Sequence, residues 1–415
     1  MRDVTDLVVV GAGAAGLATA IFAARAAPHL HVRCLDGARR VGAKILVSGG
    51  SRCNVTNRDV TERDFWGGSS RVVRNVLRAF PAARAAAFFE ELGVHLHEEE
   101  DGKLFPDTNR SRTILDALLN EAARLDIAIE TDHRFTALHR DSHGFSLATT
   151  HRALSSRAVV IATGGRSLPK TGSDGLGYDV VRGLGHGYVD TTPALAPLVL
   201  DGVRHPSLAG VSQTATLGLR VNGRMAIRLE GSLLWTHFGV SGPVVLNLSR
   251  HWHRARLEGA DVGVIMNLCP GETFESLEAW WLAHERERPR AQVSTVLSTR
   301  VPAAIADAWL AAAGIDRDTT MAHVGREDRR RLVRALVEGP VTVIDSRGYG
   351  YAEVTAGGIP LDEIDPTTMQ SRVCPGLYLV GEILDVDGRL GGFNFQWAWS
   401  SGWVAGQAIA KASRA

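Results

Sequence analysis

The stretch LVVVGAGAAGLATAIFAARAA, residues 7–27, decides the fold. Its first four residues, Leu7–Val10, are apolar and mostly β-branched, which predicts a buried strand. Gly11, Gly13 and Gly16 follow as G-x-G-x-x-G and lead into an alanine-rich segment that favours a helix. In this pattern the first glycine permits a tight turn, the second lets the backbone approach a pyrophosphate, and the third lets helix and strand pack closely. The stretch therefore predicts a dinucleotide-binding βαβ unit.

A second predicted strand, His31–Leu35, ends at Asp36, twenty residues after Gly16. A carboxylate at this spacing binds a ribose in dinucleotide-binding folds. We expect the pyrophosphate at the helix N-terminus, where Ala14 and Ala15 offer free backbone N–H groups. The apolar run is nearly long enough to span a membrane, but its lead-in MRDVTD is acidic rather than basic, unlike a signal peptide. We therefore expect no membrane segment.

The composition is ordinary for a soluble enzyme of two or three domains, with 415 residues, 45% of them hydrophobic and 22% charged. A net charge of +1 gives no general electrostatic case for nucleic acid or an anionic membrane, so neither is expected as a partner. The cysteines are far apart and form no C-x-x-C pair, which argues against disulfides and zinc. We predict no metal site and a reducing, cytoplasmic location. The four cysteines are Cys34, Cys53, Cys269 and Cys374.

Residues 1–192 are predicted to form the first part of the nucleotide-binding domain. Arg71–Leu92 and Arg110–Leu125 have helical spacing, the second with Ser111 as its expected N-cap. AVVIATGG, residues 158–165, predicts another buried strand that ends in a threonine and two glycines.

Residues 193–270 change to the alternation of an antiparallel β domain, which residues 340–351 complete. Asn222-Gly223 separates two alternating runs and predicts a hairpin with a type I′ turn. Residues 271–339 have helical spacing and are predicted to form a helical insert, in which Pro302 opens a helix that Gly314 closes. The insert contains the basic run GREDRRRLVRALVEG, whose mixed charges favour a solvated helix face over nucleic-acid binding.

Residues 352–415 return to an α/β pattern, so the nucleotide-binding domain is split between the two ends of the chain. A buried strand within residues 376–388 ends in acidic residues, and a last helix begins near Phe393. Asp385 and Asp387 do not complete the ligand pattern of a calcium loop. Carboxylates here can instead bind hydroxyls of the ribityl chain of a flavin. A helix N-terminus near a flavin would stabilise its negatively charged reduced form.

Four further stretches resemble the aminoacetone-oxidase-like family of FAD-binding proteins, also called BaiN-like or YhiN-like. They are GAKILVSGGSRCNVTN (42–57), GSLLWTHFGVSGPVVLNLS (231–249), AEVTAGGI (352–359) and GEILDVDGRLGGFNFQWAWSSGWVAG (381–406). The chain departs from the expected pattern at Ser51, in place of a third glycine, and at Arg389-Leu390.

The resemblance implies a Rossmann-like, two-dinucleotide-fold FAD domain of the α/β class, with an inserted antiparallel β domain and a helical subdomain. It also implies that VSGGSRCNVTN contacts the flavin ring and ribityl chain. The fingerprint and the resemblance together predict FAD contacts at Gly11, Gly13, Ala14, Ala15, Gly16, Asp36, Lys44, Ser48, Gly49, Arg52, Cys53, Asn54, Ala162, Thr163, Gly164, Gly381, Glu382, Asp387, Gly391, Gly392, Phe393 and Asn394.

Several side chains have two readings. Cys53 is either a redox partner of the flavin, a covalent attachment point for it or, as we favour, a packing residue. His237 is the candidate general acid or base, or a structural histidine. Trp397, Trp399 and Trp403 are expected in the core, with one of them a candidate wall of the substrate pocket.

We expect an FAD-dependent oxidoreductase that oxidises a small amine, amino ketone or related metabolite, with oxygen as acceptor. The alternative is a reductase of an unsaturated ketone or similar double bond, fed by NAD(P)H that binds transiently, because only one G-x-G-x-x-G follows a strand. A non-catalytic flavin-binding sensor and an RNA-modifying flavoprotein are further alternatives. The last requires a basic face around residues 326–334. The substrate and the oligomeric state stay open.

Overall fold

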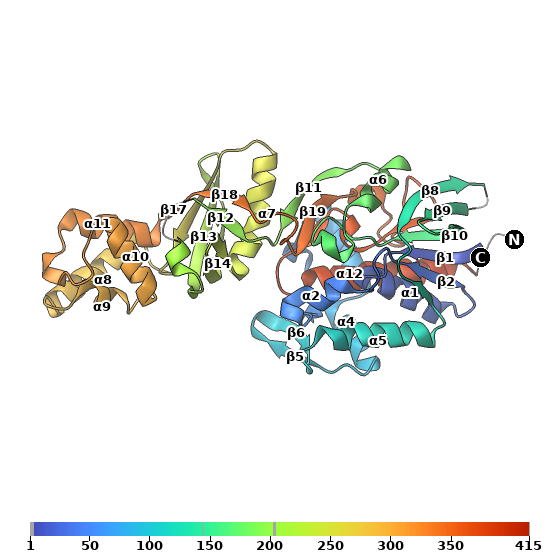
Figure 1. Cartoon of the computed structure of the whole chain (residues 1–415), viewed down its shortest axis with the longest axis horizontal. Coiled ribbons are helices and arrows are strands. Elements are labelled where there is room, and N and C mark those ends of the chain that lie inside the picture. The colour runs from blue at the N-terminus through green and yellow to red at the C-terminus, as the bar shows by residue number, and fades with distance from the viewer. Residues whose placement is uncertain (1–3, 143, 202–204, 415) are drawn as a thin grey trace. The chain divides into compact units, whose positions relative to one another are not determined.

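The computed structural model describes residues 4–142, 144–201 and 205–414. The chain forms two compact units, Met1–Pro193 with Glu353–Ala415, and Ala194–Ala352 (Figure 1). Below, they are called the first and second unit. Within the described residues, no helix is both long and apolar enough to cross a membrane.

The first unit is built on a seven-stranded sheet with the order β7-β2-β1-β10-β9-β8, in which β20 also pairs with β10. The fingerprint strand β1 pairs in parallel with β2 and β10, in register from Leu7 opposite Ala158 to Val10 opposite Ile161. The carboxyl ends of these strands therefore meet at one edge of the sheet. The strands are β1 (Val4–Val10), β2 (Val32–Leu35), β7 (Ala128–Glu130), β8 (Phe135–Asp141), β9 (Gly144–Thr149), β10 (Ala153–Ile161) and β20 (Leu377–Leu379).

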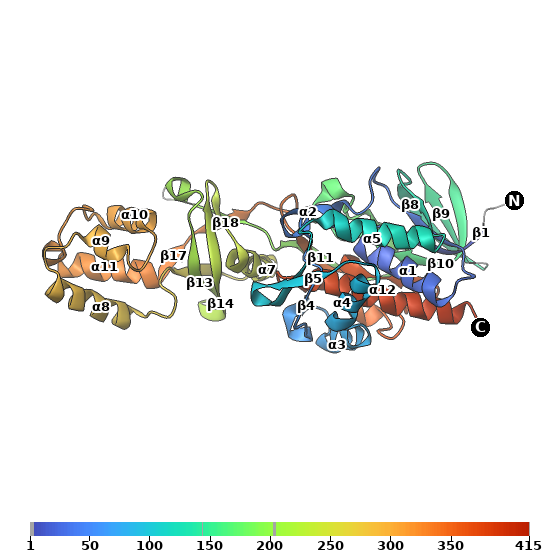
Figure 2. The same cartoon turned by 90° about the horizontal axis from the view of Figure 1, so that it is seen from below.

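Helix α1 (Ala14–Ala26) packs closely against α12 (Phe393–Ala412), the last helix. The approach depends on glycine, because a Cβ on Gly402 would lie 3.0 Å from the carbonyl oxygen of Ala15. Figure 2 shows α1 between α12 and α5 (Ser111–Arg124). The other helices of this unit are α2 (Ala43–Ser51), α3 (Ser70–Ala79), α4 (Ala82–Glu91) and α6 (Leu176–Gly183).

Two local expectations were wrong. The segment 71–92 forms two helices, α3 and α4, because Pro81 cannot continue a helix and instead precedes a new one. Ser111 is not the N-cap of α5. Arg110 holds that position, and the Ser111 hydroxyl donates to the carbonyl of Leu46 at 2.8 Å.

The segments that connect the main strands and helices of the first unit form three small sheets. They are β3-β6-β5, β21-β4 and β11-β19. Their strands are β3 (Thr56–Asn57), β4 (Phe65–Gly67), β5 (Leu96–Glu99), β6 (Lys103–Pro106), β11 (Val189–Ala194), β19 (Val354–Gly358) and β21 (Val386–Gly388).

The second unit contains a seven-stranded sheet with the order β17-β16-β13-β14-β15-β12-β18. Its strands pair antiparallel, and α7 (Pro243–Leu257) packs against it through Val244, Leu248 and Trp252. Asn222 and Gly223 have φ of +50° and +78°, which confirms the predicted type I′ hairpin. The strands are β12 (Leu198–Leu200), β13 (Ser212–Val221), β14 (Arg224–Thr236), β15 (Gly239–Ser241), β16 (Val262–Asn267), β17 (Gly339–Val341) and β18 (Val343–Ser346).

Four helices follow β16 within this unit, and Leu277, Trp281 and Leu336 contribute to their shared core with the sheet. Pro302 precedes α10 and Gly314 ends it at φ +72°, as predicted. The helices are α8 (Phe274–Glu287), α9 (Val293–Leu297), α10 (Ala303–Ala313) and α11 (Arg326–Val337).

Candidate functional site

The three glycines of the fingerprint differ in what surrounds them. A Cβ on Gly11 would lie 2.4 Å from the carbonyl oxygen of Ala162, and one on Gly16 would lie 1.8 Å from that of Gly11. A Cβ on Gly13 would meet no atom within 4 Å. Gly11 and Gly16 therefore hold the turn together, whereas the open space beside Gly13 leaves its backbone accessible to a ligand.

That open space lies at the N-terminus of α1, whose N-cap is Gly13 and which has no side-chain cap. Ala14 and Ala15 occupy the first turn, where backbone N–H groups lack partners within the helix. Aligned peptide dipoles add about half a positive charge at such an end. The arrangement suits an anionic group such as a pyrophosphate.

Asp36 directly follows β2, and its carboxylate holds the loop after β1 and the loop after β2. Its carboxylate accepts the N–H of Ala12 at 2.9 Å and that of Ala38 at 2.8 Å. Burial raises the pKa of this carboxyl, and the two backbone hydrogen bonds oppose that rise. Each oxygen of a carboxylate has a second lone pair, so the half-buried side chain can still accept a ribose hydroxyl.

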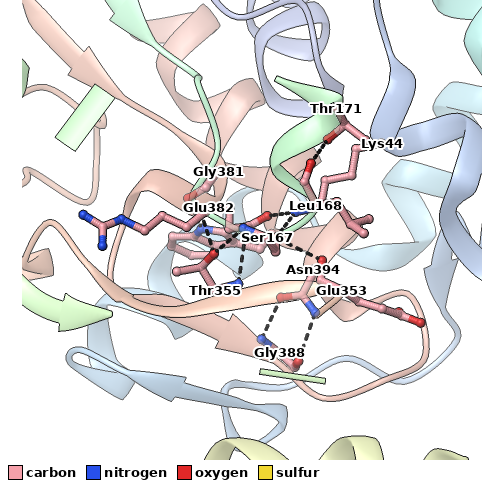
Figure 3. A network of polar contacts seen from close by, with 12 residues as sticks. Lys44, Ser167, Leu168, Thr171, Glu353, Thr355, Gly381, Glu382, Gly388 and Asn394 are labelled. Atoms are coloured by element: carbon pink, nitrogen blue, oxygen red, sulfur yellow. Dashed lines mark hydrogen bonds and ion pairs between the residues drawn. The ribbon is translucent and has the colours of Figure 1, made fainter. Parts of the chain in front are cut away.

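A second polar cluster joins segments that are far apart in the sequence (Figure 3). Lys44 donates to Glu382 and, at 2.5 Å, to the hydroxyl of Ser167. Glu382 also accepts from Ser167 Oγ at 2.7 Å and from the N–H of Thr355 at 2.9 Å. We call Lys44, Ser167, Thr355 and Glu382 the lysine network. The network holds Lys44, Ser167 and Thr355 around the carboxylate of Glu382.

Glycine is required beside this network. A Cβ on Gly165 would lie 2.4 Å from Thr355 Oγ1 and 2.9 Å from Glu382 Oε1. Thr355 Oγ1 already accepts the N–H groups of Arg166 and Ser167, at 2.8 and 3.0 Å. Gly165 therefore makes room for the Thr355 side chain. Gly164 has φ +72°, and Thr163 Oγ1 is buried without a hydrogen-bond partner in the described structure.

The stretch that resembles a flavin-contacting loop is only partly irregular. Its first residues belong to α2, which kinks at Ser48, after which Gly49 has φ +54°. Ser51 has φ +66°, so a serine stands where the backbone conformation favours glycine. Cys53 is fully buried, and burial raises the pKa of its thiol to about 12. A neutral buried thiol packs rather than reacts.

Other predicted contacts in this loop are engaged with the protein. Arg52 pairs with Glu99 at 2.6 Å and its guanidinium lies 4.1 Å from the centroid of the Phe105 ring. Asn54 is buried, and with its amide nitrogen facing the carbonyl of Thr56, its oxygen accepts from Gly392 N–H at 3.1 Å. These two side chains hold the loop in place.

The N-terminus of α12 is a second uncapped helix end. Gly391 and Gly392 have φ of +130° and +92°, and no side chain caps Phe393. Asn394 instead bonds back to Gly388, accepting at 2.8 Å and donating at 2.9 Å. Asp387 is buried, with 1% of its surface exposed. The free helix end fits the expected position of an electron-rich cofactor edge.

All the predicted FAD residues belong to the first unit, within residues 11–54, 162–164 and 381–394, and several of them lie in α1, α2 and α12. His237 belongs to the second unit, where it is exposed between β14 and β15 and lies against Phe238. Ser167, Thr355 and Glu353 were not predicted. Thr355 and Glu353 lie in the stretch AEVTAGGI, so the resemblance of that stretch could have pointed to them as site residues.

Fold and site together define a Rossmann-type FAD-binding protein. The model of the family described as HI0933-like protein Rossmann domain matches residues 5–408, and the chain belongs to this family. This confirms the resemblance and the α/β fold class, and it makes the chain an FAD-dependent oxidoreductase.

Two curated relatives match over almost their whole length. The 3-dehydro-bile acid delta(4,6)-reductase of Clostridium scindens is 31% identical, over 97% of this chain and 98% of its own. The ribosomal RNA dihydrouridine synthase of Escherichia coli is also 31% identical, over 97% of each chain.

Solved structures share the fold at lower identity. The 3-ketosteroid-delta4-(5alpha)-dehydrogenase from Rhodococcus jostii has a TM-score of 0.52 at 16% identity and covers 98% of this chain and 97% of its own. The FrdA chain of Escherichia coli quinol fumarate reductase has a TM-score of 0.51 at 18% identity, with 100% of this chain and 71% of its own covered.

Proposed function

We propose that this protein uses FAD to reduce a carbon–carbon double bond conjugated to a carbonyl group, with NADPH or NADH as the electron donor. The observation that carries the proposal is the 31% identity, over nearly the whole chain, to two relatives named for different substrates. A 3-dehydro-bile acid with 4,6 double bonds and a uridine have one reactive feature in common. In each, a double bond is polarised by a carbonyl, so its far carbon accepts hydride.

This proposal favours the reductase alternative over the amine oxidation expected from the sequence. Neither of the two relatives is named for amine oxidation or for oxygen as acceptor. In the second unit the described strands pair antiparallel, which is not the sheet of a second dinucleotide-binding domain. A nicotinamide donor would then bind transiently at the flavin.

We assign FAD to the first unit. The pyrophosphate would bind at Gly13 and the first turn of α1, and a ribose hydroxyl at Asp36. The N-terminus of α12 would face the flavin ring and stabilise negative charge on it. The lysine network would fix the loops on which these groups lie. When bound, FAD supplies the hydride-transfer chemistry, and the chain supplies binding, orientation and charge.

An anaerobic titration tests this proposal. NADPH, and then NADH, would be added to the purified FAD-loaded protein while the flavin absorption is followed. We expect bleaching by one of them, followed by recovery when a conjugated enone is added. A flavin that stays oxidised with both nucleotides but bleaches with small amines would overturn the proposal in favour of amine oxidation.

RNA is a second candidate substrate, which a specific surface feature favours. Arg220, Arg224 and Arg228 are exposed on the β13–β14 hairpin, and no ion pair involves them in the part of the chain that the structure describes. By contrast, Arg329 on α11 lies close to Glu278 and Glu285. Among the described residues, the three hairpin arginines are therefore free cations, whereas Arg329, Arg330 and Arg331 of the basic run lie beside carboxylates.

Salt dependence tests the RNA candidate. If the hairpin binds phosphates, affinity for a uridine-containing RNA fragment should fall steeply between about 50 and 200 mM salt. Replacing the three arginines by glutamine should flatten that dependence. Binding that is absent at low salt, with enone reduction intact, would leave a small molecule as the substrate.

A further inference from the structure

Glu353 has a fixed backbone at the edge of the lysine network. It directly precedes β19, two residues before Thr355, and its carbonyl oxygen accepts from Ser167 Oγ at 3.4 Å. Thr355 in turn donates its N–H to Glu382 at 2.9 Å. The position of Glu353 is therefore set by the same contacts that organise the candidate site.

The carboxylate of Glu353 is uncommitted. Across residues 4–142, 144–201 and 205–414, no hydrogen bond or ion pair involves it, and Figure 3 shows it turned away from the lysine network. Glu382, in contrast, accepts from Lys44, Ser167 and Thr355. The two carboxyl groups therefore differ, because Glu382 is hydrogen-bonded to three protein donors and, within the described structure, the carboxyl of Glu353 is not.

The surroundings of Glu353 keep its carboxyl protonated to higher pH. Burial raises its pKa, and the nearby charge of Lys44 opposes the rise. Glu353 is nevertheless an exposed residue. The two observations cover different ranges, because residue accessibility reports direct contact with water, whereas the pKa also responds to protein farther from the carboxyl. The residue is thus exposed, and its carboxyl keeps its proton to higher pH than an ordinary glutamate does.

We propose that Glu353 is the proton donor to the substrate in the reduction, an inference that rests on the proposed function. Hydride from the flavin, previously reduced by the nicotinamide donor, would form a C–H bond at the carbon far from the carbonyl. The electron pair of the double bond would move toward the carbonyl. The carboxylic acid of Glu353 would then protonate the adjacent carbon, and water would reprotonate the resulting carboxylate. The flavin is oxidised and the double bond becomes a single bond.

The test separates the two half-reactions in Glu353→Gln. A glutamine has the same shape but cannot donate a proton as an acid. We expect anaerobic flavin reduction by the nicotinamide to be unchanged, and reoxidation by the enone to be slowed about 10²-fold or more, the usual contribution of general acid catalysis. Glu353→Asp should recover part of that rate. Asp362→Asn, an exposed carboxyl nearby in the sequence, is the matched control and should change neither half-reaction.

A second readout needs no turnover. A carboxyl with a raised pKa in the folded state makes the protein less stable as pH rises. The loss begins near the ordinary glutamate pKa of 4.5 and is complete above the pKa in the folded state. Glu353→Gln should therefore melt at the same temperature as the wild type at pH 4.5 and below, and at an increasingly higher temperature than the wild type as pH rises above that value.

The outcomes distinguish this inference from the proposed function. If the wild-type flavin is never reoxidised by any enone, the proposed function fails. If the wild type turns over and Glu353→Gln reoxidises at the wild-type rate, Glu353 is not the proton donor. Equal melting temperatures of the two proteins at every pH would contradict the uncommitted, proton-holding carboxyl itself.

Discussion

Trp399 in α12 donates its indole N–H to the carbonyl oxygen of Val55, which lies 2.8 Å away and 344 positions earlier in the chain. Both groups are buried, and Phe89 packs edge-on against the same indole. The bond connects the last helix to the loop that resembles the flavin-contacting segment. Through this contact, the packing of the first unit depends on both of its chain segments.

Replacing Trp399 by Phe should keep most of the packing and leave the Val55 carbonyl without its donor. An unsatisfied buried acceptor costs about 1–3 kcal/mol, which urea denaturation would measure. The control is Trp403→Phe, since Trp403 stacks on Phe80 and is only half-buried. Equal losses in the two variants would mean that the hydrogen bond contributes nothing beyond the ring.

Gly13 and Gly16 should respond differently to alanine. Gly16→Ala places a Cβ 1.8 Å from the Gly11 carbonyl, so we expect little folded protein. Gly13→Ala meets no protein atom within 4 Å, so melting of the FAD-free protein should be unchanged while FAD affinity falls at least about tenfold. Calorimetric FAD titration and thermal melting measure the two effects. An FAD affinity of Gly13→Ala equal to that of the wild type would place the pyrophosphate elsewhere.

Lys44 should control the pH dependence of substrate reduction. The proposed proton donor must be protonated, so the reoxidation rate should fall as pH rises through the pKa of Glu353. The charge of Lys44 lowers that pKa, so Lys44→Met should move the falling limb to higher pH. Stopped-flow reoxidation of the FAD-loaded proteins, followed from pH 4.5 upward, would measure it. A shift toward lower pH would contradict the assignment of the titrating group.

Ser51→Gly should stabilise the protein. Ser51 has φ +66°, a left-handed conformation that costs a non-glycine residue about 1–2 kcal/mol. Glycine removes this cost but gains entropy in the unfolded chain, so we expect a net gain of about 0.5–1 kcal/mol in unfolding free energy. A loss of stability would show that the serine side chain has a compensating role.

Ser371, His186 and Glu363 have the arrangement of a hydrolase triad but should not act as one. Ser371 Oγ lies 2.7 Å from His186 Nε2, and His186 Nδ1 lies 2.6 Å from Glu363. Ser371 is buried, and its hydroxyl accepts the N–H groups of Val373 and Cys374. A fluorophosphonate probe should therefore leave the native protein unlabelled. Ser371→Ala should instead cost about 1–3 kcal/mol of stability. Labelling of Ser371 at the native fold would refute this structural role.

The sequence was most informative where local chemistry determines structure. The fingerprint glycines, the Asn222-Gly223 hairpin and the Pro302 and Gly314 helix ends each depend on backbone conformations that few residues adopt. The return of an α/β pattern in residues 352–415 predicted that the nucleotide-binding domain is split between the two chain ends.

The sequence was least informative where distant segments meet. Lys44, Ser167 and Glu382 form one network across 338 positions, and no periodicity predicts such a contact. The engaged state of Arg52 and the free carboxylate of Glu353 are likewise matters of tertiary packing. A sequence does not show which charged side chains are paired with other residues. That depends on the tertiary contacts around each of them.

The split of the first unit has a consequence for how the protein is made. The ribosome releases β1 and α1 first, but their partner α12 spans Phe393–Ala412, so the nascent sheet stays without its covering helix during most of translation. The second unit is one continuous segment and can fold meanwhile, since domains generally fold as units during synthesis. The candidate cofactor site would thus be completed only after α12 has been synthesised, which makes FAD binding a marker of that step.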